Sequence, residues 1–281
     1  MEKIFSQYIM KGSVFMKRAH EVEFNIYGDD MQFVEIVLDS REAIIAEAGA
    51  MMYMDEGIIM DSIFGDGSER KSGGITDKLF GAGKRLLTGE SLFMTRFENT
   101  DGFSKKVAFS APYPGKIIPM DLMDEGGTII CQKDAFLCAA HGISVDIAFQ
   151  KKIGVGIFGG EGFIMQKLSG DGLSFLHAGG AIIEKYLQPG ECIKIDTGCL
   201  VAMNNSVDYN IEVSGNVKTA LFGGEGLFLA TLRGPGKVWL QSLPFSRLAN
   251  RMYSAATKAG GKSKGEGSLL NIGLDTFFGN D

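Results

Sequence analysis

FGGEG, residues 158–162, occurs a second time at residues 222–226, 64 residues further along the chain. At this spacing residues 115–179 align with residues 179–243 without a gap. Ten of the 35 aligned positions around the shared motif are identical, whereas unrelated sequences of ordinary composition would share roughly two or three. The internal repeat is therefore the feature of this sequence that decides the fold.

A third, less similar copy lies upstream. Residues 42–58 align with residues 191–207 at a spacing of 149, and residues 89–93 align with residues 224–228 at a spacing of 135. The difference, 149 − 135 = 14 residues, indicates an insertion in the first copy at about residues 61–87. The sequence thus divides into an N-terminal extension (1–22), three repeats (23–115, 116–179 and 180–243) and a C-terminal tail (244–281).

Each copy has the pattern of β-strands. Apolar and polar side chains alternate over residues 143–150 and again over residues 209–213. Runs with no polar face, such as residues 227–230 and 238–240, are typical of strands covered on both sides. We therefore expect an all-β fold of three tandem β-sandwich or double-stranded β-helix-like repeats. They would close on themselves in a pseudo-threefold arrangement, which removes free sheet edges.

Two segments depart from the β pattern. In the insertion, Ile75, Leu79 and Leu86 have helical spacing and predict a short helix. In the tail, Phe245 and Met252 lie on one apolar stripe of a second short helix. Residues 227–264 carry seven basic side chains and no acidic one, and the chain beyond the helix reads as a flexible linker with an apolar end.

Composition excludes several classes of protein. Glycine makes up 39 of 281 residues without a three-residue period, so the chain is not collagen-like. A hydrophobic content of 45% with a net charge of −6 excludes general disorder. Apolar runs stop well short of the roughly 18 residues that a membrane-spanning helix needs. Four cysteines without CxxC spacing, and a basic N-terminus without a secretion signal, predict reduced thiols in a cytoplasmic protein.

Several motifs resemble one known family. They are DMQ (30–32), EAIIAEAGAM (42–51), GESLF (89–93), both FGGEG turns and GPGKVWLQS (234–242), and they span about residues 24–245. In this order and spacing, the chain resembles the Altered Inheritance of Mitochondria protein family. One departure is Ser40-Arg41, where the family usually has a Pro-Gly turn.

The resemblance implies a fold and no reaction. Members of the family are similar to three fused units of the tryptophan RNA-binding attenuation protein, and they have no established catalytic residues. The eukaryotic branch is linked to the organisation of the mitochondrial inner membrane. The resemblance thus implies a scaffold role, and it agrees with the threefold repeat.

A metal-dependent cupin site would need two or three histidines and a carboxylate around one metal. The chain has only His20, His141 and His177, and it contains no His-x-His pair. Cys138 and His141 have the spacing of ligands, but their equivalents in the last repeat are alanine and asparagine. We expect Cys131 and Cys138 to be packed core thiols, and we predict no metal site.

The remaining candidates also favour structural roles. Glu90, Glu161 and Glu225 form a repeated carboxylate that could bind a cation, but each comes with a glycine turn whose backbone it could accept from. Gly261–Gly265 fits G-x-S-x-G within a flexible tail, where no histidine is placed to activate Ser263. We predict no catalytic residue, no cofactor and no enzymatic activity.

These patterns predict a non-enzymatic β scaffold or binding module that self-associates as a homo-oligomer and acts near a membrane. The basic C-terminal tail is the segment expected to contact a protein partner or an anionic membrane surface. A net charge of −6 argues against a nucleic-acid partner. Two alternatives remain, an RNA-binding regulatory protein and a sensor with a small-ligand pocket between repeats.

Overall fold

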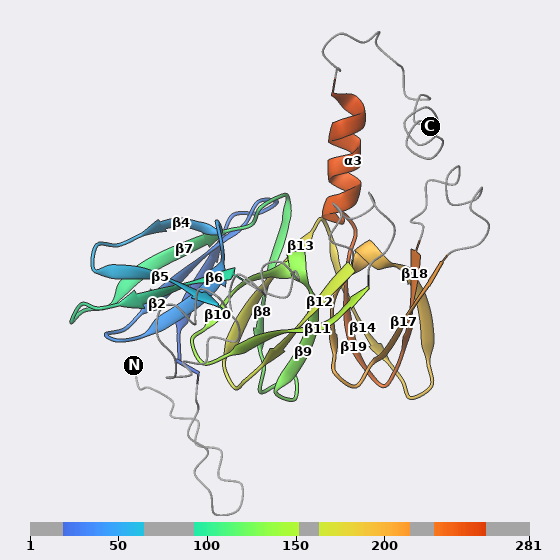
Figure 1. Cartoon of the computed structure of the whole chain (residues 1–281), viewed down its shortest axis with the longest axis horizontal. Coiled ribbons are helices and arrows are strands. Elements are labelled where there is room, and N and C mark those ends of the chain that lie inside the picture. The colour runs from blue at the N-terminus through green and yellow to red at the C-terminus, as the bar shows by residue number, and fades with distance from the viewer. Residues whose placement is uncertain (1–18, 65–92, 152–162, 214–227, 257–281) are drawn as a thin grey trace, which may run out of the picture.

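A computed structural model describes residues 19–64, 93–151, 163–213 and 228–256. Strands dominate this part of the chain, and α3 (Phe245–Ala255) follows the last of them (Figure 1). The predicted all-β fold with a C-terminal helix is therefore confirmed. The helix predicted within the insertion lies at residues 75–86, outside the described residues, as does the linker beyond residue 256.

The described strands form four antiparallel sheets. The first has the order β1 (Glu23–Tyr27), β2 (Phe33–Leu38), β7 (Lys105–Ser110), β4 (Met51–Met54). The second has the order β5 (Ile58–Phe64), β6 (Phe93–Asn99), β3 (Ala43–Glu47), β10 (Phe136–Ala140), β13 (Leu173–Gly179), β8 (Gly115–Asp121). The third has the order β11 (Ser144–Lys151), β12 (Phe163–Ser169), β9 (Thr128–Gln132), β16 (Leu200–Asn204), β19 (Gly236–Gln241), β14 (Ile182–Leu187). The fourth has the order β15 (Cys192–Asp196), β18 (Phe228–Arg233), β17 (Asp208–Val213).

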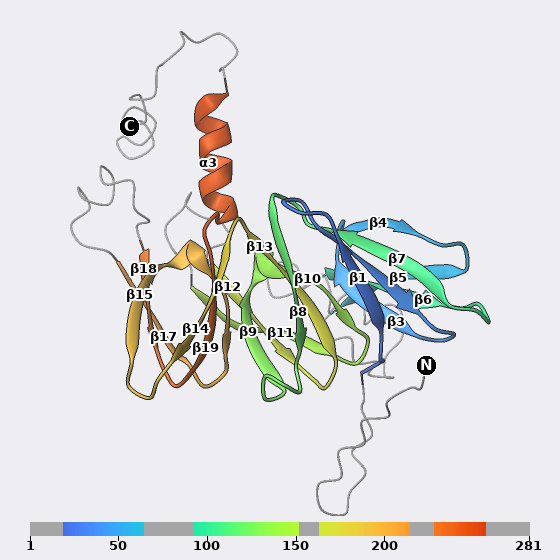
Figure 2. The same ribbon diagram turned by 180° about the vertical axis from the view of Figure 1, so that it is seen from behind.

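We define three units of six consecutive strands: the first unit is β2–β7, the second β8–β13 and the third β14–β19. Each six-stranded sheet takes three strands from one unit and three from the next. The joining pairs are β3 with β10 and β9 with β16. Figures 1 and 2 show the units following one another in a row, with β4 at one end and β17 and β18 at the other.

The predicted closure of the units on themselves is not what the described strands form. Each join uses one strand from each of two consecutive units, so three units in tandem make two joins. One strand is then left without its counterpart at each end of the row, namely β4 and β15. The described sheets of one molecule are thus open. The pseudo-threefold symmetry of the repeats stays a prediction.

The boundaries of two predicted segments also differ. The N-terminal extension was expected to end at residue 22 outside the fold, but Ala19 and Val22 are buried against the second unit. The backbone N–H of Ala19 donates to Asp171 Oδ1 at 2.9 Å, and that of His20 donates to the carbonyl of His141 at 2.9 Å. The insertion was expected to begin at residue 61, but β5 continues to residue 64 because it pairs with β6 along its whole length.

The joining strands have no polar face because both of their faces are covered. Every residue of β10 is buried, and Ala43–Ala46 of β3 are buried as well. Strands at the margins keep the alternation seen in the sequence, as in β11, where Val145 is buried and Asp146 is exposed. In β3 and β10 a continuous apolar run therefore accompanies burial of both faces, and in β11 an alternating run accompanies a half-exposed margin.

The start of α3 is held by a close approach between the second and third units. The N–H of Gly179 donates to Gln241 Oε1 at 2.8 Å, and the N–H of Leu243 donates to the carbonyl of Gly179 at 3.1 Å. A Cβ at Gly179 would collide with the carbonyl oxygen of Leu243 and lie 2.7 Å from the ring of Tyr113. Only glycine lets β13 pass this close to the link into α3.

Gly179→Ala should therefore lower the free energy of unfolding by about 1–3 kcal/mol, the usual range for overpacking. Urea unfolding followed by circular dichroism would measure the change. Gly102→Ala is the control, because nothing lies within 4 Å of a Cβ built there. Equal midpoints for the two variants would contradict this account of the link.

Burial shifts the pKa values of two ionisable groups, Glu47 and His177, in opposite directions. Desolvation, with a further contribution from the charge of Asp134, raises the pKa of Glu47 from 4.5 to about 7. Burial lowers the pKa of His177 from 6.5 to about 4, which the nearby backbone of Tyr113 only weakly opposes. Neither ring nitrogen of His177 makes a hydrogen bond of normal geometry to a described residue. Glu47 is thus held in its neutral form below about pH 7, and His177 is held in its neutral form above about pH 4.

Replacing Glu47 with glutamine should change the pH dependence of stability in a defined direction. Between pH 4.5 and 7 the folded state keeps a proton that the unfolded chain releases, so the contribution of Glu47 to stability falls as pH rises. The advantage of Glu47→Gln over the wild type should therefore grow across this window, by up to about 3 kcal/mol. Urea midpoints measured at several pH values would follow it.

In the Glu47→Gln variant, the opposite pH dependence that His177 gives to the free energy of unfolding should become visible. Its contribution is present above pH 6.5 and is lost as pH falls toward 4, because the unfolded chain then binds the extra proton. Glu23→Gln, at an exposed position of β1, is the matched control. A constant difference between Glu47→Gln and the wild type at every pH would refute the assignment.

Candidate functional site

The most prominent surface feature is the helix α3, which stands away from the sheets (Figure 1). The helix begins after Pro244, whose carbonyl accepts hydrogen bonds from the N–H groups of Arg247 and Leu248. Phe245 contacts the ring of Tyr113, with ring centroids 5.3 Å apart, and so fastens the first turn to the loop between β7 and β8. These contacts anchor the base of the helix to the sheets.

The exposed part of α3 combines apolar and basic side chains. Met252 is 66% exposed and Tyr253 is 62% exposed, values that are unusual for large apolar residues. Arg247 and Arg251 lie one turn apart on a neighbouring face, and Arg247 contacts Asp196 Oδ2 at 3.3 Å. The helix has no acidic residue. This arrangement is typical of a helix that lies on an anionic interface.

A second feature is the edge strand β4 at one end of the row. Met52 and Met54 are 54% and 37% exposed there. The opposite face of β4 is fixed by Tyr53, whose hydroxyl donates to the buried carboxylate of Glu35. Lys106 Nζ donates to the other oxygen of that carboxylate at 2.8 Å.

This cluster holds the edge strand in place without offering a reactive group. The hydrogen bonds from Lys106 and then Tyr53 hold the pKa of Glu35 below its usual value, and the bond to Glu35 raises the pKa of Tyr53 to about 12. The sequence does not reveal this cluster, because its members lie far apart in the chain and come from β2, β4 and β7. Neither residue spacing nor a motif could have indicated it.

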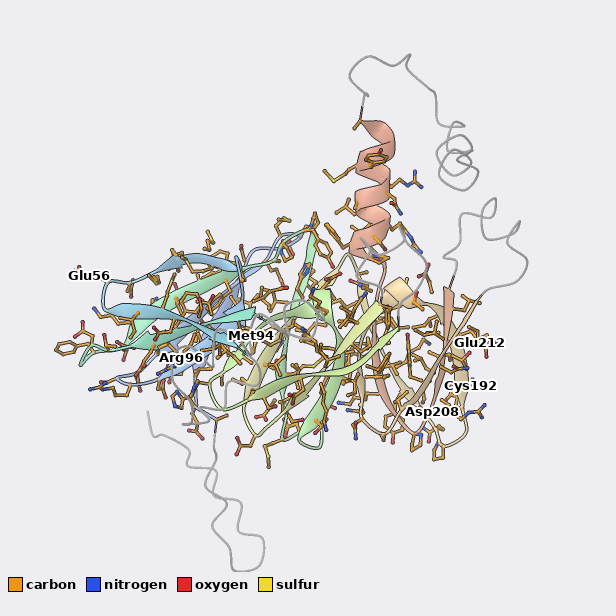
Figure 3. The ribbon with its side chains drawn as sticks, in the orientation of Figure 1. Glu56, Met94, Arg96, Cys192, Asp208 and Glu212 are labelled. Carbon is orange, nitrogen blue, oxygen red and sulfur yellow. The ribbon has the colours of Figure 1, made fainter. Side chains whose placement is uncertain are left out.

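A third feature is the edge strand β15 at the other end of the row. Cys192 is exposed, and Lys194 approaches Glu212 Oε2 of β17 at 3.4 Å. Ile193 and Ile195 are partly buried against the core of the third unit. Figure 3 shows Cys192 and Glu212 at this end, and Glu56, in the turn after β4, at the opposite end.

The structure brings two of the three histidines together. The rings of His20 and His141 have centroids 5.1 Å apart, and His20 Nδ1 accepts a hydrogen bond from the N–H of Ala43 at 2.8 Å. An open depression of about 240 Å³ lies beside His20 and is also lined by Glu21 and Asp121. In the described part of the chain, no group of three or more His, Cys, Asp or Glu side chains is placed to hold a metal ion.

The thiols differ in their surroundings. Cys131 and Cys138 are fully buried, and burial raises the pKa of both well above the ordinary value. Cys192 is exposed and Cys199 is partly exposed, and the four cysteines are thiols that form no disulfide among the described residues. Glu90, Glu161, Glu225 and Ser263 lie outside the described residues.

No helix of the described residues is long and apolar enough to cross a membrane. Among the features that the described residues offer to other molecules are the projecting helix, the edge strands β4 and β15, and the depression beside His20.

Comparisons with known proteins agree with this architecture. An uncharacterised protein of Streptococcus pyogenes serotype M6 is 30% identical over 230 residues, which cover 79% of this chain and 86% of that protein. The X-ray crystal structure of a Streptococcus pyogenes protein superposes with a TM-score of 0.66 at 24% identity, covering 84% of this chain and all of that one. This structural likeness shows the fold, while the predicted similarity to the tryptophan RNA-binding attenuation protein stays a prediction.

The family model described as mitochondrial biogenesis AIM24 matches residues 24–243. That range contains all three units and ends just before α3. The chain therefore belongs to the AIM24 family, as the motifs in its sequence indicated.

Proposed function

We propose that the chain is a non-enzymatic β scaffold that self-associates and contacts anionic membrane surfaces through α3. The observation that carries this proposal is the amphipathic helix held away from the sheets, with Met252 and Tyr253 exposed beside Arg251. A helix with this distribution gains free energy from burying apolar area among lipid headgroups and from attraction to anionic lipids.

The contribution of one such helix is small. An 11-residue helix has three turns and two arginines, so single molecules would bind vesicles weakly and reversibly. Self-association supports the proposal because an assembly presents several helices to one surface, and linked weak contacts gain through effective concentration. The buried thiols of Cys131 and Cys138 fit a cytoplasmic site of action, where thiols stay reduced.

Vesicle sedimentation of the full-length protein tests the membrane contact. Vesicles of phosphatidylserine and phosphatidylcholine should bind the protein, while vesicles of phosphatidylcholine alone should bind it much less, and added salt should weaken the binding. Replacing both Met252 and Tyr253 with serine should lower the vesicle-bound fraction at least about tenfold, because each large apolar side chain contributes on the order of 1.5–3 kcal/mol when fully buried.

Phe103→Ser is the matched control, because Phe103 is 79% exposed in the turn after β6 and lies away from α3. This variant should bind vesicles as the wild type does. Equal losses in the two variants would overturn the role of α3. Binding of single-stranded RNA with a steep salt dependence, in the absence of vesicle binding, would favour the RNA-binding alternative instead.

A further inference from the structure

The two internal joins show how one unit recognises the next. In the first join, the contributing residues of β3 are all apolar, and Ile44, Ile45 and Ala46 face three residues of β10. In the second join, Ile129, Ile130 and Cys131 of β9 face three residues of β16. Both joins place the third strand of a unit beside the second strand of the preceding unit.

The register of the two joins is also the same. A bulge interrupts the pairing of β10 with β13 between Phe136 and Cys138, and Cys138 then faces Ala46 across the join. A bulge interrupts the pairing of β16 with β19 between Leu200 and Ala202, and Ala202 then faces Cys131. The residue that follows the bulge therefore sets the register of each join.

The strands at the two ends of the row have the same features but no counterpart. β4 is the third strand of the first unit, and its pairing with β7 has a bulge between Met51 and Tyr53. β15 is the second strand of the third unit, and among the described strands it pairs only with β18. The two strands lie at opposite ends of the molecule, as Glu56 and Cys192 show in Figure 3.

Exposure at β4 shows what a partner would cover. Met52 is 54% exposed and Met54 is 37% exposed. The residues at the same places around the bulges of the joined strands are buried, with Leu137 at 2% and Ala139 at 0% in β10, and 0–3% for Val201 and Met203 in β16. β4 thus carries apolar side chains where its joined counterparts are covered by a preceding unit.

We propose that β15 of one molecule pairs with β4 of a second copy, so that molecules associate head to tail. The fourth sheet, β17-β18-β15, then continues into β4-β7-β2 of the neighbour. The result has the strand order of the two six-stranded sheets, with β1 added at its margin. The inference rests on the proposed self-association and identifies the surfaces that carry it.

The internal joins identify the residue of β15 that takes the central place in this contact. Ile195 lies 64 residues after Cys131, which is the spacing of the repeat. Ile195 faces Ala230 within its own sheet, and Cys131 faces Gln166, the residue 64 positions before Ala230. Ile195 is therefore the counterpart of Cys131 at the open end of the row.

The bulge of β4 then fixes the register of the contact. Tyr53 follows that bulge, so Ile195 of one molecule lies opposite Tyr53 of the next. It follows from antiparallel pairing that Lys194 lies opposite Met54 and that Ile193 lies opposite Asp55, which gives three pairs as in each internal join. Cys192 and the turn residue Glu56 lie directly beyond the last of these pairs.

Lys194 makes this contact weaker than the internal joins. Ile45 and Ile130 occupy its place in β3 and β9. A lysine on an edge strand opposes indiscriminate pairing, and its long side chain must remain near water or near Glu212. The contact is therefore reversible, and its head-to-tail geometry gives rings if the rotation closes and filaments if it does not.

Charge substitutions at the paired positions test the proposed register. Association is measured by sedimentation velocity of the full-length protein across a wide range of concentration. Met54→Lys places like charges opposite one another and should weaken association about threefold to tenfold. Adding Lys194→Glu to that variant restores opposite charges and should recover most of the loss. Met123→Lys is the control, because Met123 is 54% exposed but lies in the turn after β8.

The outcomes separate this inference from the wider proposal. If Met54→Lys leaves association unchanged, or if Lys194→Glu fails to restore it, the edge contact is wrong while self-association still stands. A wild-type protein that stays monomeric at every concentration would overturn both. Vesicle binding by α3 is measured separately and stands or falls on its own variants.

Cross-linking gives a second, direct readout. In a Cys199→Ser background, Glu56→Cys should be joined to the natural Cys192 of a neighbouring molecule by a short thiol-reactive reagent, because the two positions lie directly beyond the last residues paired across the contact. Removal of the natural thiol by Cys192→Ser should abolish the product. Persistence of the product in that variant would show β4 paired with β4 and would refute the head-to-tail contact, as would a yield no higher than that of Met123→Cys.

Discussion

The pairing of a strand from one unit with a strand from the next is the interaction on which the rest of the structure depends. Through β3 with β10 and β9 with β16, backbone hydrogen bonds join consecutive units into shared sheets. Because the joining strands are covered on both faces, their side chains are apolar without alternation. The hydrophobic core consequently runs across the unit boundaries, with Trp239 of the third unit packed in the same cluster as Ile36 of the first.

The same joins place the surfaces that face other molecules. A tandem array with two joins has two ends, and these ends carry an exposed methionine edge and a lysine-bearing edge. The projecting helix begins beside the second join, where Gly179 at the end of β13 and Tyr113 in the loop before β8 hold the link that leaves β19. The helix and the open edges are thus separate features of one row, and contact through one leaves the other free.

Several buried polar groups of the described residues have structural explanations. Glu35 binds Tyr53 and Lys106 and fixes the edge strand, while Gln241 accepts from Gly179 and donates to the carbonyl of Gly198. Such groups are stable in the interior because each hydrogen-bonding atom has a partner. His177 differs, since burial holds it neutral without a hydrogen bond of normal geometry, and it packs edge-on against Tyr113 at 4.4 Å between centroids. Its place at the base of α3 makes it part of the packing that positions the helix.

The sequence alone determined the class of fold, the family and the positions of several strands. Alternation predicted β11 and β17, continuous apolar runs predicted β18 and β19, and the stripe from Phe245 predicted α3, because these patterns depend only on which face of a local element is buried. Tertiary structure alone decided that the units form an open row, that residues 19–22 pack on the second unit, and that Glu35 meets Tyr53. Those outcomes depend on which strand edges meet across long separations in the chain, and side-chain periodicity carries no information about the partner of an edge.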